Sequence, residues 1–342
     1  MGSTRWPDKL KEVKRLIEDE IHQLQLIYQV HSHELVPDAN ALSPPELFHY
    51  TTIEGLRGIL ENRCLWATHY ESLNDSTEVV HGRMLFARIV QERIEHCSEL
   101  PKLLLHSMLD GHGNIFENIC IYLACLCENG DLLSQWRAYS NGGKGFALGM
   151  KPRMILQGSK PTLPSPQQFG FGVTKVIYDE KKQHELFYGL VDRVFTRVED
   201  ILPISLNYIK DVGQLHAFLE TTTSPLLAAM LYLNFQMCYR VKNPAFQEEK
   251  EWRLVCIMGN EKTAGESTTP EVKHRTRNGV DIPYIEIPIH SADPNEYCFD
   301  VTRIICGPTL QPDSMRAEIG KLLKASGFNG VIVEKSQIPL RE

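Results

Sequence analysis

Strand-like segments of this chain are short and unevenly spaced, and that spacing constrains the fold more than any other feature. Long helical patterns gather in two stretches and do not alternate with the strands. A regular alternation would favour a doubly wound parallel sheet. The sequence instead predicts an α+β fold with a mixed, mainly antiparallel central sheet of short strands and helical insertions. After strands near residue 47 and at 64–68, strands are predicted at 119–127, 145–150, 171–178, 252–258, 282–287, 299–306 and 330–334.

Residues 1–37 predict an amphipathic helix set apart from a single α+β domain at 38–342, which carries a helical insertion near 180–240. Apolar side chains recur in this first helix at three- and four-residue steps, with Lys, Glu and Asp between them. Such a stripe needs cover, either from the rest of the chain or from a second copy or another partner. The stripe consists of Leu10, Val13, Leu16, Ile17, Ile21, Leu24, Ile27 and Val30.

Composition argues against several classes of protein. The net charge of −7 gives no basic field of the kind that non-specific nucleic-acid binding needs. No apolar run is long enough to span a bilayer, and the amino terminus lacks the apolar core of a signal peptide. We therefore expect a cytoplasmic protein with no membrane partner.

The nine cysteines agree with a reducing compartment, because most of them sit inside apolar runs. Cys125 and Cys127 should share one face of a strand, but no CxxC pair adds the remaining ligands of a zinc site. Structural cysteines are therefore favoured over metal ligands, and no metal is predicted.

Residues 47–78 place many polar side chains at the ends of a strand, helix, strand unit. The Thr51-Thr52 pair can cap the helix, which is predicted to begin near Glu54. His49 is either a satisfied core histidine or a ligand contact. Asn74 or Asp75 is a candidate N-cap for the next helix, with Glu78 as the capping-box partner, and we assign all three to the scaffold.

Residues 129–139 predict a short helix capped by Asp131. One interpretation is a surface helix that uses Trp136 as its anchor in the core. The other is that packing holds Arg137 so that its guanidinium can meet an anion such as a pyrophosphate. The sequence weights the two equally.

The segment 248–253 runs directly into an apolar strand. On an extended backbone Glu249, Glu251 and Arg253 project from one face. The simplest interpretation is a surface ion network, which contributes little to stability. If the face lines a cleft, the carboxylates become candidates to stabilise a developing cation, as glycosyl transfer requires.

Taken together, these segments resemble the bacterial domain-of-unknown-function family 2971 over residues 48–341. The likeness rests on their order and spacing, and it brings no settled activity. The residues that carry it are His49-Tyr50-Thr51, Trp66-Ala67, Asn74-Asp75 with Glu78, Ser134 to Arg137 with Tyr139, the EKEWR segment from Glu249 to Arg253, Ile305 to Pro308, Ser336, Pro339 and Arg341.

A second resemblance is to the ADP-ribosyltransferase superfamily, which cleaves NAD. It implies that His49 contacts a ribose hydroxyl, that Glu251 of the Glu-x-Glu pair stabilises the ribosyl oxocarbenium, and that Arg137 suits the pyrophosphate. For the aromatic residue that stacks on nicotinamide, Tyr50, Trp66, Tyr70 and Tyr139 are all candidates. The catalytic candidates are Glu251, His49 and Glu249, and the cofactor-binding candidates are His49, Tyr50, Thr51, Trp66, Arg137, Tyr139 and Arg253.

The leading hypothesis is an NAD-utilising, ADP-ribosyltransferase-like protein that cleaves the nicotinamide–ribose bond, by transfer or by hydrolysis. The alternative is a non-enzymatic module that binds a nucleotide or a partner, with the first helix mediating assembly. In a third interpretation Arg137, Asp75 and the glutamates form a purely structural ion network. The enzymatic hypothesis requires His49, Arg137 and Glu251 to converge on one pocket.

Overall fold

A computed structural model describes residues 8–34, 45–73, 78–96, 119–152, 170–207, 224–259, 270–289 and 299–339, with a few single positions between them. The chain divides into two compact units. The helical unit comprises Met1–Leu35, Thr77–Ile119 and Ile177–Lys242, and the sheet unit comprises Val36–Ser76, Cys120–Val176 and Asn243–Glu342. This differs from the predicted single domain at 38–342, because two inserted stretches pack with the amino-terminal helix.

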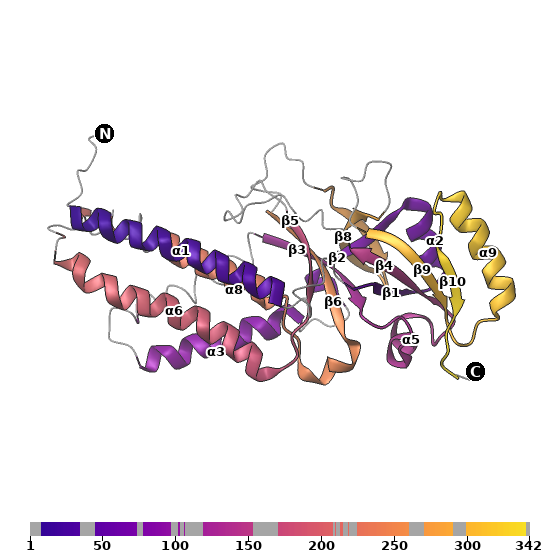
Figure 1. The fold of residues 1–342 in the computed structure, drawn as a ribbon, viewed down its shortest axis with the longest axis horizontal. Helices are drawn as coiled ribbons and strands as arrows, with labels where there is room; N and C mark the ends of the chain where they lie inside the picture. Colours follow the sequence, from indigo (N-terminus) through magenta and orange to yellow (C-terminus); the bar gives the residue numbers. More distant parts are fainter. Residues whose placement is uncertain are drawn as a thin grey trace. The chain divides into compact units, whose positions relative to one another are not determined.

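The helical unit is built from long helices, of which α1 packs on both α6 and α8. Leu10, Val13, Ile17 and Leu24 are each at most 2% exposed, so these four residues of the α1 stripe are covered within the same chain, whereas Leu16 is 40% exposed. The helices are α1 (Asp8–Glu34), α3 (Glu78–Glu95), α6 (Glu180–Leu206) and α8 (Ser224–Cys238) (Figure 1).

Glu20 holds α1 to α6 through two cations. Its carboxylate lies 2.5 Å from Arg193 Nε and 2.8 Å from Arg197 Nη2, and the side chain is only 4% exposed. On the far side of the unit, α3 approaches α8 closely: a Cβ built on Gly82 would lie 2.5 Å from the Cα of Cys238. Only glycine allows the two backbones to meet at that distance.

The sheet unit contains a mixed sheet in the order β10-β9-β4-β1-β3-β2-β8-β7, with β6 pairing β3 and β5. The β9–β10 pair is parallel, and every other pair whose register is given is antiparallel, which confirms the predicted fold class. The strands are β1 (Leu47–Thr51), β2 (Cys64–His69), β3 (Ile119–Cys127), β4 (Phe146–Pro152), β5 (Gly170–Lys175), β6 (Glu251–Gly259), β7 (Lys273–Arg277), β8 (Val280–Pro288), β9 (Phe299–Cys306) and β10 (Ile332–Lys335).

The sheet has two faces with different cores. The larger core contains Leu47, Leu148 and Trp252 and is shared with helices α2 (Ile53–Asn62) and α9 (Pro312–Ala325); we call this side the α2 face. A smaller core contains Phe48, Tyr50, Cys127, Trp136, Ala147 and Ile305 under helix α5 (Leu133–Tyr139); this is the α5 face. Neighbouring residues of β1 alternate between the two cores, as strand geometry requires.

Local signals for α2 are confirmed. Thr52 is the N-cap and accepts a hydrogen bond from the Gly55 amide at 3.2 Å. Arg63 ends the helix in the left-handed conformation, at φ 54°. Asn74 and Asp75 lie outside the described residues, and Glu78 is the first residue of α3. Among the described helices, none is long and apolar enough to cross a membrane.

Candidate functional site

Strands β1 and β2 both pair with β3, at different points along its length. Phe48 of β1 pairs with Cys127, whereas Thr68 of β2 pairs with Leu123. Neither strand is registered against Cys125 in the described residues. We call this place the β3 split.

The His49 side chain contacts β3 at the β3 split. Its Nδ1 lies 3.1 Å from the carbonyl oxygen of Cys125, which can only accept, so Nδ1 carries the proton and Nε2 keeps a lone pair. Burial lowers the pKa of His49, because desolvation disfavours the charged ring. The ring is half-buried, and no partner of Nε2 is found among the described residues. A neutral ring in this tautomer can accept a hydrogen bond from a ligand hydroxyl.

Glu128, directly after β3, is a carboxylate that sequence reasoning overlooked. It follows the last residue of β3 and accepts a hydrogen bond from Trp252 Nε1 at 2.8 Å, besides an ion pair with Lys175. Trp252 belongs to the core of the α2 face. His49 alternates with Phe48 and Tyr50 and so lies on that face too. The signal that was available is a lone Glu directly after a long apolar strand.

Glu251 does not share a face with His49. It alternates along β6 with Trp252 and Leu254, both of which belong to the core of the α2 face, so its carboxylate projects to the other side. There it pairs with Arg253, whose Nε lies 2.8 Å from Oε1. Glu251 is 3% exposed and Arg253 is fully buried. The pair is therefore an internal one and not the surface network that the sequence suggested.

Glu249 is not on the strand at all. It ends a 3-10 helix, η4 (Pro244–Glu249), and Lys250 turns the chain into β6 with a left-handed φ of 45°. This turn breaks the extended backbone on which the shared face was predicted. Glu249 Oε1 lies 3.4 Å from the hydroxyl of Tyr139 on α5, whose side chain is 38% exposed. The Glu249 carboxylate thus contacts α5 and does not share a strand face with Glu251.

Tyr50 is part of the scaffold. Its hydroxyl donates to the Asn129 carbonyl at 2.7 Å and accepts from the Leu132 amide at 2.9 Å. Its ring meets Trp136 edge-on, with centroids 4.8 Å apart. Burial raises the pKa of the Tyr50 hydroxyl. With both functions of the hydroxyl used internally, Tyr50 holds the turn before α5 and is not free to stack on a ligand.

Asp131 does not cap α5, because the N-cap position is Leu132. Its carboxylate instead accepts from Trp136 Nε1 at 2.7 Å, from Ser336 Oγ at 2.5 Å and from the Gln337 amide at 2.7 Å. This cluster joins α5 to the carboxyl-terminal segment. Trp136 and Ser336, which both belong to the spaced pattern described above, are thus joined through Asp131.

The remaining candidates are dispersed. Arg137 is exposed on α5, on the α5 face, and has no hydrogen bond or ion pair with the described residues. Trp66 is 41% exposed and projects from β2 on the side away from the core residues Leu65 and Ala67, beneath the guanidinium of Arg275 at 5.1 Å. Thr51 ends β1 beside the start of α2. The convergence of His49, Arg137 and Glu251 is thus not what the structure presents.

Among the described residues, no group of three His, Cys, Asp or Glu is arranged to hold a metal ion. The thiol of Cys127 donates to the carbonyl of Glu249 at 3.0 Å and accepts from the Asn129 amide, and burial raises its pKa to about 11. Cys127 is consequently a structural thiol.

Residues 135–254 match the sequence model of a family described as protein of unknown function (DUF2971). The matched stretch begins in α5, includes α6 and α8, and ends in β6 at the Glu251–Arg253 pair. It therefore takes in parts of both units. No curated protein and no solved structure matches the chain.

Proposed function

We propose that the sheet unit binds NAD, or a nucleotide of similar build, at the β3 split, and that the reaction carried out there is cleavage of the nicotinamide–ribose bond. The observation that carries the proposal is the His49 ring, held neutral with Nδ1 committed to Cys125 and Nε2 left as an acceptor. A ribose offers hydroxyl donors at its edge, which is the complement of such a ring.

The carboxylate assigned to the reaction is Glu128, in place of Glu251. Glu128 lies on the face of His49, and 26% of its side chain is exposed. In the cleavage, the C–N bond breaks with its electron pair leaving on nicotinamide, and water or an acceptor hydroxyl attacks the ribosyl carbon. A carboxylate beside that carbon stabilises the positive charge that develops.

Lys175 and Trp252 support this assignment of Glu128. The ammonium of Lys175 and the indole N–H of Trp252 both contact its carboxylate, which fixes its orientation without burying it. An oriented and partly exposed carboxylate needs little reorganisation when positive charge appears next to it. The Glu251 carboxylate, in contrast, would first have to leave its buried pairing with Arg253.

The test separates binding from turnover. The full chain is titrated calorimetrically with NAD, ADP-ribose and nicotinamide, and nicotinamide release is followed by chromatography. We expect NAD and ADP-ribose to bind, because both carry the ribose hydroxyls, and we expect Glu128→Gln to stop release while NAD still binds. Binding without release in the unmodified protein would support the alternative, a non-enzymatic nucleotide-binding module. No binding of either nucleotide would contradict both forms of the proposal.

A further inference from the structure

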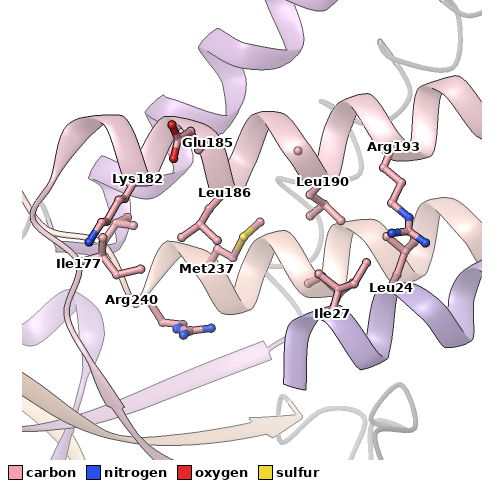
Figure 2. Close-up of a pocket in the computed structure, with 13 residues that line it drawn as sticks. Leu24, Ile27, Ile177, Lys182, Glu185, Leu186, Leu190, Arg193, Met237 and Arg240 are labelled. Atoms are coloured by element: carbon pink, nitrogen blue, oxygen red, sulfur yellow. The ribbon is translucent and has the colours of Figure 1, made fainter. Parts of the chain in front are cut away.

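The helical unit contains a cavity of about 490 Å³ that the proposed function does not use. Its walls come from α1, α6 and α8, with the segment that precedes α6 and the one that follows α8 at one end. Figure 2 shows Leu186 and Leu190 of α6, Met237 of α8 and Ile27 of α1 directed at a common space. Volumes of this size are typical of small-molecule sites.

The cavity walls are apolar along most of their length. Leucine, isoleucine and methionine side chains offer no hydrogen-bond donor, and the backbone groups of a helix bond within the helix. A ligand with a polar body would lose its water there without compensation. Apolar cavities of this kind take up apolar molecules in preference to water. The occupant therefore needs a hydrocarbon body.

The charged residues near the opening of the cavity keep their contact with water. Lys182 and Glu185 lie one turn apart on α6, both line the cavity, and both are exposed. They carry opposite charges, and Glu185 also pairs with Lys181 at 3.7 Å, where both side chains are more than half exposed. Charges that remain hydrated do not require a counter-ion from a ligand.

The two arginines of the wall are engaged by the protein itself. Arg193 pairs with Glu20 of α1, whose carboxylate lies 2.5 Å from its Nε. Arg240 is only 3% exposed and interacts with other groups of the chain. Together with the hydrated pair on α6, these contacts give the cavity no preference for an anion or for a cation. An uncharged occupant is the best match to such walls.

From this arrangement we propose that the cavity binds an uncharged lipid with one aliphatic chain and a hydroxyl head, of the fatty-alcohol class. The chain lies between α1, α6 and α8, and the hydroxyl lies at the opening beside Lys182 and Glu185. A hydroxyl both donates and accepts, so it complements an ammonium donor next to a carboxylate acceptor. This site lies wholly in the helical unit and is independent of the nucleotide site in the sheet unit.

Gly189 provides a direct test. It lies one turn from Leu186 on the lining stripe of α6, and a Cβ built on it meets no atom within 4 Å. Gly189→Phe should therefore fill the cavity without strain, and Gly189→Leu should fill it in part. Gly320 on α9 of the sheet unit also has open space around its Cβ, so Gly320→Phe is the matched control.

The experiment is a calorimetric titration of the full chain at neutral pH with 1-decanol, decanoate and decylamine, which share one chain length and differ in charge. We expect saturable binding of one decanol per chain, and each charged compound should bind at least about threefold more weakly. Gly189→Phe should weaken decanol by about tenfold or more and Gly189→Leu by roughly threefold, whereas Gly320→Phe should leave it unchanged.

Three results would overturn the proposal. The first is the absence of decanol binding, including the case in which the protein sediments with phosphatidylcholine vesicles but does not bind monomeric decanol. The second is binding of decanoate or decylamine that is as tight as that of decanol or tighter. The third is decanol affinity that is unchanged in the folded Gly189 variants.

Discussion

Arg253 Nε lies 2.8 Å from Glu251 Oε1, and both side chains are buried inside the sheet unit. Removal of one partner from a buried pair leaves an uncompensated charge, which costs far more than loss of an exposed pair. Whether Glu251 acts on a ligand or on the fold is therefore a question that stability measurements answer.

Glu251→Gln should lower the free energy of unfolding by about 3–5 kcal/mol, because Arg253 would remain charged and buried. Urea unfolding followed by tryptophan fluorescence measures this, since Trp66, Trp136 and Trp252 all lie in the sheet unit. The control is Glu318→Gln, which breaks the pair with Arg57 in which both side chains are 52% exposed. That change should cost less than about 1 kcal/mol. Equal effects of the two substitutions would show that the Glu251–Arg253 pair is not an internal one.

Asp131→Asn should loosen the carboxyl-terminal segment. The carboxylate accepts three hydrogen bonds, from Trp136, Ser336 and the Gln337 amide, and an asparagine side chain can accept at one atom only. We expect a loss of about 2 kcal/mol, together with faster proteolysis after residue 336. Ser336→Ala removes the bond to Asp131 and the bond that its hydroxyl accepts from the Ile338 amide at 3.1 Å, and it should cost about 1–2 kcal/mol. Unchanged proteolysis in Asp131→Asn would contradict the role of Asp131 as the anchor.

Glu20→Gln should release α1 from α6. Burial alone would raise the pKa of Glu20, but hydrogen bonds from Arg193 and Arg197 outweigh it and hold the pKa below its usual value. The carboxylate thus stabilises the unit above its ordinary titration range and ceases to do so as pH falls through the lowered pKa. Hydrogen exchange of α1 should accelerate in Glu20→Gln and stay unchanged in Glu12→Gln, whose exposed partner is Lys9. Equal exchange in both variants would be evidence against the anchor.

The lowered pKa of His49 predicts a pH dependence. Below its ordinary pKa of 6.5, His49 binds a proton in the unfolded chain but stays neutral in the folded chain. The free energy of unfolding is therefore highest above this pH and decreases as the pH falls towards the lowered pKa of the folded state. His69 contributes in the same direction, because burial lowers its pKa as well. Denaturant unfolding between about pH 7 and pH 5 should show a shallower decline in His49→Asn than in the unmodified protein. Identical slopes would mean that His49 is not held neutral.

Patterns carried by long apolar runs predicted the fold well. The nine-residue run from Ile119 to Cys127 is a strand over its predicted length, and so is the run from Phe299 to Cys306. The strand Lys273–Arg277 was missed, because its sequence KHRTR is polar throughout and its place at the sheet edge leaves most of it exposed. Periodicity reports burial, and an exposed edge strand buries little.

The site was harder to predict than the fold, because alternation along a strand places neighbours on opposite faces only where the backbone is extended. Lys250 has a left-handed φ, and this one residue removes Glu249 from the face of Glu251. Pairing between strands decides which other residues share a face of the sheet. Glu128 and His49 lie on the same face although they are about 80 positions apart in the sequence, and no local pattern predicts this. His49 remains the leading residue for ligand contact, whereas Tyr50 and Asp131 belong to the scaffold.

The most direct test of the central claim compares NAD binding by the unmodified protein and by His49→Asn. Asparagine reproduces the donor to the Cys125 carbonyl and removes the acceptor at Nε2, so the fold is kept and only the ligand contact is lost. His274→Ala, which removes an exposed histidine paired with Asp281, is the control. Calorimetric titration should show NAD affinity reduced by about tenfold or more in His49→Asn and unchanged in His274→Ala. NAD affinity that is the same in all three proteins would contradict the assignment of His49 to the ribose.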